Sequence, residues 1–229
     1  IIYMGDFINL NKKIIRCCKC PRLVKFRKKI STVKRKLYIN EKYWGKPITG
    51  FGDTNGRILF VGLAPAAHGG TRTGRVFTGD RSSDFLYKCL YRAKISNQST
   101  STHLNDGLKL NKAFITTALK CVPPEDKPLK IELENCFNFF NQEINGLKNL
   151  RVIVALGKIA FDACLYFYKT NYNFSGKLKF KHGKFFKLNK KILLVASYHP
   201  SPRNVNTGRI NLKKMVTLFT KVKKLSKIL

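Results

Sequence analysis

Acidic residues are scarce in this sequence. Its 229 residues include 12 aspartates and glutamates against 45 lysines and arginines, which gives a formal net charge of +33. Solubility requires far less charge than this, so we expect a polyanionic partner. The basic residues recur along the whole chain between apolar residues, a distribution typical of charged outer faces that bind nucleic acid. A lysine-rich genome or a hot habitat is the alternative, although heat usually enriches glutamate as well.

Long apolar runs are also missing. No apolar segment reaches the length of a membrane span. Residues 1–13 carry Asp6 within their apolar part and have no small-residue cleavage site. These absences predict a soluble, intracellular protein without a membrane partner. The length and an apolar fraction of 44% suffice for one domain with a sizeable core, which we assign to residues 1–229.

Residues 62–80 contain five glycines, in GLAPAAHGGTRTGRVFTGD, but lack the elements of a phosphate loop. A Walker loop requires glycine-lysine followed by serine or threonine, and the G-x-G-x-x-G turn of a dinucleotide site is shorter. The stretch offers instead a tight turn after an apolar run, an aromatic ring at Phe77 and a carboxylate at Asp80. A helix is expected to begin just afterwards, at Ser82 and Ser83.

Histidine is absent beside the cysteine pairs, so a metal site among them would be all-sulfur. Cys17 and Cys20 form a C-x-x-C pair, and Cys121 and Cys136 follow much later. Four thiolates suit an iron–sulfur cluster or a structural zinc ion. The spacing alone leaves a cluster, zinc and no metal open. Cys18 could replace Cys17 as a ligand, although C-x-x-C geometry favours Cys17.

The full set of seven cysteines argues against a disulfide framework in a chain expected to be intracellular. Cys89 and Cys164 fall on the apolar faces of expected helices. We therefore expect both to be small buried hydrophobes.

Four short runs are uniformly apolar and rich in β-branched residues, which is typical of strands covered on both faces in a parallel sheet. Segments with helical periodicity separate them, and further helices are expected at both ends of the chain. This alternation predicts a three-layer α/β architecture around a parallel sheet. Residues 171–190 alternate around His182 and Gly183 and predict a hairpin attached to the last strand. The strands are expected at 57–64, 112–119, 151–157 and 191–197, and the intervening helices at 82–95, 130–144 and 157–170.

Ligands of such a sheet bind beyond the carboxyl ends of its strands. Three loops there are the most unusual pieces of the sequence, and we expect them to form an active site: 62–80, 119–128 and 197–209. Two prolines stiffen the chain after His199, which suits a wedge in stacked DNA, with Arg203 and Arg209 on phosphates. The alternative for His199 is a strand-end histidine that hydrogen-bonds the backbone.

The loops at 62–80 and 199–209 closely resemble the first and last signature motifs of the family-five uracil-DNA glycosylases of bacteria and archaea. The segments CCKCPRL and LKCVPPEDKP, with ENC further on, are similar to the cluster-binding cysteine pattern of family-four and family-five enzymes. The resemblance runs from Cys17 to Arg209 in the family's order. It implies a three-layer α/β/α sandwich with a central four-stranded parallel sheet, which agrees with the strands expected above.

The activity implied by this resemblance is that of a monofunctional DNA repair glycosylase. Such an enzyme flips a deaminated base out of DNA, because the glycosidic bond is not reachable inside the duplex, and hydrolyses that bond to leave an abasic site. The implied partner is DNA containing uracil or other deaminated bases. The implied cofactor is a structural [4Fe-4S] cluster on Cys17, Cys20, Cys121 and Cys136. We expect a monomer in the cytoplasm, associated with the nucleoid.

The resemblance also implies roles for individual residues. His199 would donate a hydrogen bond to the uracil oxygen where charge develops, and Phe77 would stack on the flipped base. Asp80 is the candidate for orienting water, with a helix-terminal residue favoured by the helix dipole as the alternative. The backbone amides of Gly62, Leu63 and Ala64 would line the pocket. Contacts to the DNA are expected from Arg72, Arg75, Ser201, Pro202, Arg203, Asn204 and Arg209.

Thr117 departs from the family-four pattern, in which asparagine reads the uracil edge. One hydroxyl replaces a bidentate amide, so we expect looser discrimination, with hypoxanthine or xanthine as additional substrates, which family-five enzymes accept. Ala64 is apolar where several other glycosylase families have a polar residue, although family-five enzymes share this feature. These two residues motivate an alternative, a catalytically silent DNA-binding protein that keeps the fold and the cluster. A zinc-bearing RNA-binding protein is a remoter alternative.

Overall fold

The computed structural model describes the backbone of residues 4–228 and the side chains of residues 7–227. A six-stranded sheet crosses its centre in the order β1-β3-β2-β4-β6-β5. The four inner strands pair in parallel, and they confirm the four strands expected from the apolar runs. They are β2 (Ile58–Gly62), β3 (Ala113–Thr117), β4 (Val152–Leu156) and β6 (Leu193–Ser197).

Two short antiparallel strands extend the sheet at its edges. β1 (Phe51–Gly52) pairs with β3, and β5 (Phe185–Lys187) pairs with β6. The prediction of four strands is therefore confirmed for the parallel part of the sheet, but it misses the two antiparallel edge strands. A strand of two or three residues is too short to show a periodic pattern in the sequence.

The hairpin expected over 171–190 is misplaced. Its turn lies between β5 and β6, where the N–H of Leu188 donates to the carbonyl of Ile192, and residues 174–182 form no strand. The ring of His182 stacks on that of Tyr198 with centroids 4.9 Å apart. Its Nδ1 accepts the Tyr198 N–H at 3.0 Å. In residues 174–182, His182 therefore packs against another ring, and the segment does not pair as a strand.

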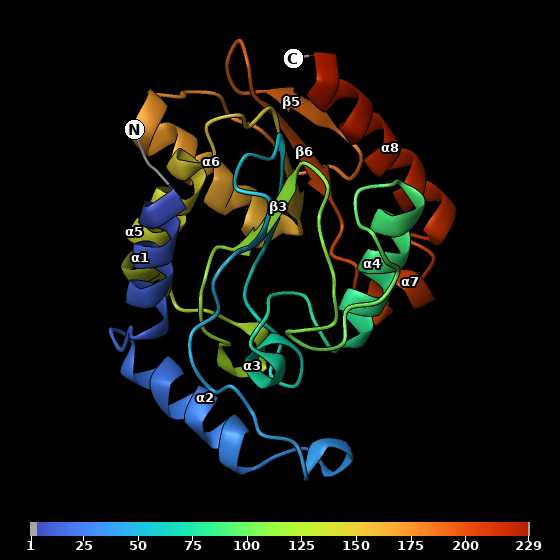
Figure 1. The fold of residues 1–229 in the computed structure, drawn as a ribbon. Coiled ribbons are helices and arrows are strands. Elements are labelled where there is room, and N and C mark those ends of the chain that lie inside the picture. Colours follow the sequence, from blue (N-terminus) through green and yellow to red (C-terminus); the bar gives the residue numbers. More distant parts are fainter. Residues whose placement is uncertain (1–3, 229) are drawn as a thin grey trace.

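Helices cover both faces of the sheet and form the expected three-layer sandwich (Figure 1). The face drawn on the left carries α5 and α6, with α1 packed on α5, and the opposite face carries α4 and α8, which pack on each other. None of the helices within residues 4–228 is both long and apolar enough to cross a membrane. The helices are α1 (Met4–Ile15), α2 (Pro21–Thr32), α3 (Gly70–Thr73), α4 (Arg81–Arg92), α5 (Lys130–Gly146), α6 (Lys158–Tyr172), α7 (Pro202–Asn206) and α8 (Leu212–Ile228), with 3-10 turns at Lys36–Tyr38 and Pro124–Asp126.

The strands alternate their side chains between two cores. Phe60 and Val154 face the helices α4 and α8, whereas Leu59 and Ile153 face α5 and α6. All four side chains are fully buried, and burial of such a side chain stabilises the fold by about 1.5–3 kcal/mol. The same burial confirms the expectation for Cys89 on α4 and Cys164 on α6. Because both faces are covered, a ligand reaches this sheet at its edges and strand ends.

Candidate active site and cysteine cluster

The loops that follow the parallel strands meet at one edge of the sheet. Gly62 at the end of β2 lies beside Thr117 at the end of β3. Gly157, directly after β4, donates its N–H to the carbonyl of Ser197 at the end of β6, at 2.8 Å. A Cβ at Gly157 would lie 3.6 Å from the Cβ of His199. The edge therefore gathers residues from four strands, as expected from the sequence.

Gly62 provides the space in which an aromatic ring lies against the strand ends. A Cβ at Gly62 would lie 2.7 Å from the ring of Phe77 and 3.4 Å from Cγ2 of Thr117, so a larger residue would displace the ring. Phe77 has a φ of 48°, in the left-handed region that costs a non-glycine residue about 1–3 kcal/mol. Its ring is 8% exposed. The loop thus holds Phe77 in a strained conformation against Gly62 and Thr117.

His199 faces this aromatic ring from the other side of the edge. The ring centroids of Phe77 and His199 are 6.1 Å apart, with 33° between the planes. Burial lowers the pKa of His199 to about 4, because a desolvated imidazole is costly to charge. At neutral pH the side chain is therefore an uncharged imidazole, which carries one N–H donor.

The rigid segment after His199 forms the short helix α7. Ser201 caps it by accepting the N–H of Asn204 at 3.4 Å, and Pro202 is its first residue, a position that proline favours. The Nδ2 of Asn204 donates to the carbonyl of His199 at 2.9 Å. Asn204, expected to contact DNA, thus also fixes the backbone of the histidine.

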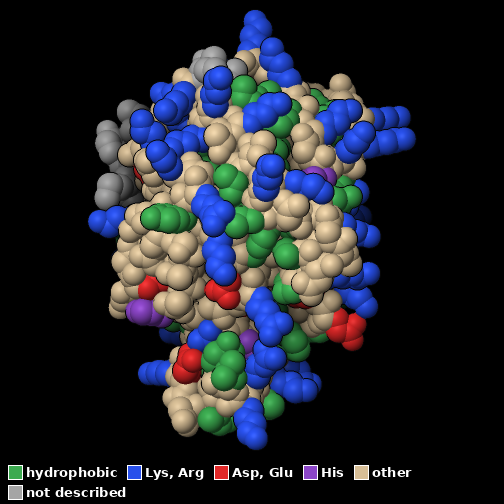
Figure 2. Space-filling model, turned by 90° about the vertical axis from the view of Figure 1, so that its right-hand side faces the viewer, with side chains coloured by type: hydrophobic (Ala, Val, Ile, Leu, Met, Phe, Trp, Pro, Cys, Tyr) green, Lys and Arg blue, Asp and Glu red, His purple; other side chains and the backbone are tan. Residues whose placement is uncertain are grey.

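A basic hollow opens beside His199. Arg209 lines this hollow, and its guanidinium lies 5.8 Å from the ring centroid of Tyr198. Arg203 on α7 is exposed as well but does not line the hollow. Lys158 and Lys179 line the hollow as well. The sequence analysis did not single out these two lysines, because nothing in the sequence distinguishes them from the general surplus of lysine. Figure 2 shows many Lys and Arg side chains over the upper part of the drawn face and in a band down its middle, with few acids.

Asp80 caps helix α4. Its Oδ1 accepts the N–H groups of Ser82 and Ser83 at 2.8 and 3.0 Å, and the Ser83 hydroxyl accepts the Asp80 N–H in return. Burial raises the pKa of the Asp80 carboxyl, and the two cap bonds oppose this shift. Its Oδ2 lies so close to Gly69 that a Cβ there would clash with it. The capping alternative is therefore realised, and the second carboxylate oxygen faces the glycine-rich loop.

Arg72 and Arg75, expected on the DNA backbone, lie inside the protein and are 8% and 3% exposed. The guanidinium of Arg72 bonds to Glu41 and to the carbonyls of His68 and Gly79. Arg75 pairs with Asp106 at 2.6 Å and bonds through its other nitrogens to Thr78 and Leu104. Each arginine nitrogen already has a partner, so the prediction for these two residues does not fit the structure. Both arginines instead hold the glycine-rich loop in shape.

Four cysteines line one small cavity between α1, α2, α5 and the loop after β3: Cys17, Cys20, Cys121 and Cys136. Burial raises the pKa of Cys121 to about 12 and that of Cys136 to about 11. The other cysteines of the set raise the pKa of Cys121 further, since nearby thiolates repel one another. Cys18 is exposed and does not line the cavity. The structure therefore gathers the four cysteines that the sequence singles out.

Hydrogen-bond donors accompany these thiols. The amide of Asn135 lies 3.7 Å from Sγ of Cys20, and the N–H of Lys120 lies 3.2 Å from Sγ of Cys136. Arg27 is 6% exposed and donates to the carbonyls of Gly45 and Cys17. The Nε of Arg27 is buried without a hydrogen-bond partner. A buried cation with an unused donor beside four thiols suits an anionic group at this position.

The four cysteines line the same cavity. Among the described residues, no group of three or more His, Cys, Asp or Glu side chains could hold a single metal ion.

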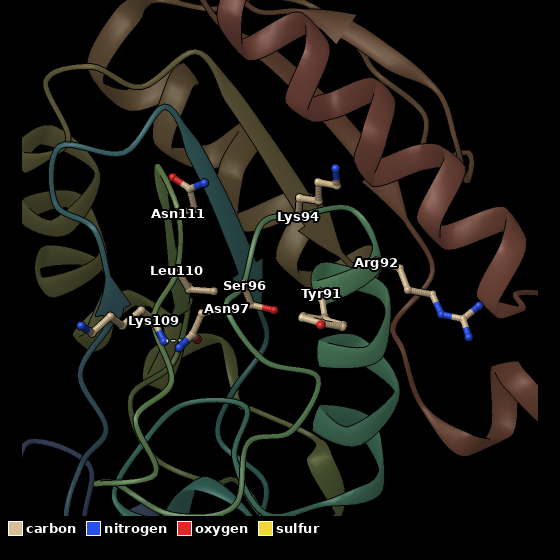
Figure 3. A pocket seen from close by; sticks show the side chains of 8 residues that line it. All are labelled: Tyr91, Arg92, Lys94, Ser96, Asn97, Lys109, Leu110 and Asn111. Atoms are coloured by element: carbon tan, nitrogen blue, oxygen red, sulfur yellow. Dashed lines mark hydrogen bonds between the residues drawn. The ribbon is translucent and has the colours of Figure 1, made fainter.

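A separate hollow lies on the α4 side of the molecule, away from the strand ends (Figure 3). There the N–H of Lys109 donates to the side-chain oxygen of Asn97 at 2.6 Å. The lining of this hollow includes neither a histidine nor a carboxylate. It is lined by Tyr91, Arg92, Lys94, Ser96, Asn97, Lys109, Leu110 and Asn111.

Sequence comparisons relate this chain to one family of known proteins. The family model described as the uracil DNA glycosylase superfamily matches residues 49–223. A type-5 uracil-DNA glycosylase of Pyrobaculum aerophilum is 39% identical over 217 residues, which cover 95% of this chain and 91% of that protein. One of Thermus thermophilus is 40% identical, over 92% of this chain and 94% of its own. A type-4 uracil-DNA glycosylase of Archaeoglobus fulgidus is 27% identical over 67% of this chain and 70% of its own length.

Proposed function

The chain belongs to the uracil-DNA glycosylase superfamily, and from this premise we propose that it excises uracil from DNA. It hydrolyses the bond between the base and deoxyribose and leaves an abasic site. The observation that carries the proposal is the meeting of Gly62, Phe77, Thr117 and His199 at the ends of neighbouring strands. One domain over residues 1–229, acting as a monomer on DNA in the cytoplasm and nucleoid, accords with this function.

His199 stabilises the departing base. Cleavage of the glycosidic bond leaves negative charge on a uracil oxygen, and a donor in a water-poor pocket is most effective where charge develops. A histidine with a pKa of about 4 is neutral at physiological pH. Its remaining N–H therefore donates to the uracil oxygen without a proton having to be taken up first. The bond from Asn204 to the His199 carbonyl holds the backbone of this donor in place.

Phe77 and the glycine turn hold the flipped base. The ring of Phe77 stacks on the uracil, and the backbone amides of Gly62, Leu63 and Ala64 approach its edge. Thr117 lies beside Gly62, where its single hydroxyl reads the base. A hydroxyl selects less strictly than a bidentate amide, so hypoxanthine and xanthine are additional substrates in this proposal.

Asp80 directs the water. One carboxylate oxygen caps α4 and the other faces the glycine-rich loop, so capping and water orientation use different atoms of the same group. The DNA strand lies along the basic hollow beside His199, in contact with Ser201, Pro202, Arg203, Asn204 and Arg209. Arg72 and Arg75 take no part in this surface, because they are buried in ion pairs.

Cys17, Cys20, Cys121 and Cys136 hold a [4Fe-4S] cluster. The unpartnered Nε of Arg27, the donors at Cys20 and Cys136 and the shared cavity of the four thiols all suit such an anionic group. Its contribution is a covalent tie between the start of α2, the loop after β3 and α5. Ala64 packs against the same apolar cluster as these cysteines, so this tie also supports the glycine turn proposed to approach the base.

A panel of deaminated bases tests the proposal. Oligonucleotides with one uracil, hypoxanthine or xanthine are incubated with the protein and then treated with alkali, which cleaves at abasic sites. We expect cleavage at uracil, and slower cleavage at the other two. Tight binding to abasic DNA without cleavage at any of the three bases would instead identify a catalytically silent DNA-binding protein.

A further inference from the structure

A buried ion pair lies beneath the end of β3. The ammonium of Lys120 lies 2.5 Å from Oε2 of Glu143, on helix α5, and both residues are almost completely buried. The Oγ1 of Thr116 donates to the same carboxylate oxygen at 2.7 Å. The other carboxylate oxygen, Oε1, accepts the N–H of Gly50 at 3.0 Å. The pair is thus fully enclosed by the protein's own polar groups.

Stability alone does not account for such a pair. Desolvation of two charges costs about as much as their attraction returns, and a well-packed apolar pair of similar volume is often equally stable. What the pair provides is a fixed direction for the hydrogen bonds of the ammonium. Besides Glu143, Lys120 Nζ donates to Oγ1 of Thr116 at 2.7 Å and to the carbonyl oxygen of Thr117 at 2.8 Å.

Thr117 is the residue whose position this network determines. Its Cγ2 would lie 3.4 Å from a Cβ at Gly62, which the ring of Phe77 also contacts, so its side chain borders the proposed base site. Its carbonyl oxygen accepts a hydrogen bond from Lys120. The N–H of Lys120 also donates to Sγ of Cys136 at 3.2 Å. One residue therefore joins the base pocket to the cysteine cluster through two hydrogen bonds.

We propose that Lys120, held by Glu143, is a positioning residue that sets the end of β3 for base recognition. The inference rests on the proposed glycosylase function and adds a residue that does not touch the base. Its effect is on the excision of a bound base, not on the contact between the protein and the DNA backbone.

The test removes the ion pair while keeping its shape, with Lys120→Met combined with Glu143→Gln. The glutamine oxygen can still accept the N–H of Gly50, and its NH2 group can donate to the hydroxyl of Thr116 in place of the bond that Glu143 accepts, so no buried charge is left unpaired. The control removes an exposed ion pair of the same helix, Lys130 and Glu134, whose charged atoms are 3.7 Å apart, by Lys130→Met with Glu134→Gln. Single-turnover excision of uracil and affinity for abasic DNA are measured for each protein, together with the visible absorbance of the cysteine centre.

We expect the buried double variant to excise uracil at least tenfold more slowly. Its affinity for abasic DNA should stay within threefold of the wild type, and its absorbance and the behaviour of the control should be unchanged. A smaller loss of rate would overturn the inference, and so would a parallel tenfold loss of DNA affinity, which a general structural defect would produce. An inactive wild type would refute the proposed function instead.

A second variant covers the case in which the double variant does not fold. Thr116→Val removes only the hydroxyl that bonds both Lys120 and Glu143 and preserves the side-chain volume. An excision rate at least threefold lower with unchanged affinity for abasic DNA would support the role of Lys120. A rate within threefold of the wild type would contradict it.

Discussion

At the residue scale, burial and backbone strain set the properties of the proposed site residues. Burial lowers the pKa of His199 to about 4, so its imidazole is neutral at physiological pH. Phe77 keeps a strained backbone because Gly62 leaves room for its ring. Both residues could be identified from the sequence, since they follow apolar runs and belong to distinctive loops.

The pH dependence of excision follows from the pKa of His199. The folded value of about 4 lies below the ordinary 6.5, so the neutral form is present throughout the range from pH 6 to 8. We expect a flat excision rate across that range. Below about pH 4 the rate should fall about tenfold per pH unit, because the charged form replaces the neutral one.

Single-turnover rates from about pH 3 to pH 8 check this expectation, with circular dichroism to confirm folding at each pH. The free energy of unfolding should also depend on pH through His199. Between pH 6.5 and 4 the unfolded chain binds a proton that the folded one does not, so the stability contributed by His199 is lost as the pH falls through that window. A step in the excision rate near pH 6.5 would contradict the neutral-histidine account.

Other residues could not be assigned from the sequence. The partners of Arg72 and Arg75 are Glu41 and Asp106, which lie about thirty residues away along the chain, and local patterns do not show which arginine is buried. Lys120 and Glu143 meet for the same reason only in the folded protein. Among 45 basic residues, charge alone does not separate structural from surface positions.

At the scale of helices and strands, the residues of the candidate site lie at the carboxyl ends of the parallel strands and at the start of α4. The four parallel strands were predictable because each is uniformly apolar, and their order places Gly62, Thr117, Gly157 and Ser197 at one edge. The edge strands β1 and β5 were not predictable, because pairing with β3 and β6 rather than composition defines them. At the start of α4, one carboxylate oxygen of Asp80 caps the helix and the other lies against Gly69.

Two substitutions separate the roles of Asp80. Asp80→Ala removes the cap of α4 and should cost about 1 kcal/mol, or about 2–4 °C in Tm for a protein of this size. Asp80→Asn keeps a side-chain oxygen for the N–H groups of Ser82 and Ser83. If the carboxylate directs water, Asp80→Asn should retain the wild-type Tm and lose at least tenfold in kcat. Full activity of the Asp80→Asn variant would show that Asp80 caps α4 and does not direct the water.

Cys17 and Cys18, which are adjacent in the segment between α1 and α2, allow a controlled comparison of two cysteines. Cys17 lines the cavity shared with Cys20, Cys121 and Cys136, whereas Cys18 is exposed. We expect Cys17→Ser to lose the broad visible absorbance and part of the iron of an iron–sulfur centre, and Cys18→Ser to keep both. Iron and zinc analysis of the two purified proteins provides the second readout. Equal metal content in both variants would show that Cys17 is not a ligand.

At the scale of the whole molecule, the net charge and the fold have different parts in the proposed binding of DNA. A net charge of +33 attracts DNA at long range, and Figure 2 shows basic side chains over the upper part of the drawn face and in a band down its middle. This attraction is independent of sequence and of the base. Selection of a deaminated base therefore depends on the strand-end pocket and not on the charge of the surface.

The most direct test of the account compares the wild type with His199→Ala on DNA containing one uracil. The wild type should release free uracil and leave an alkali-labile site. The variant should do so about 10²–10³ times more slowly, the usual cost of losing a donor to developing charge, with unchanged affinity for abasic DNA. Absence of uracil release by the wild type, or an equal rate in both proteins, would contradict the account.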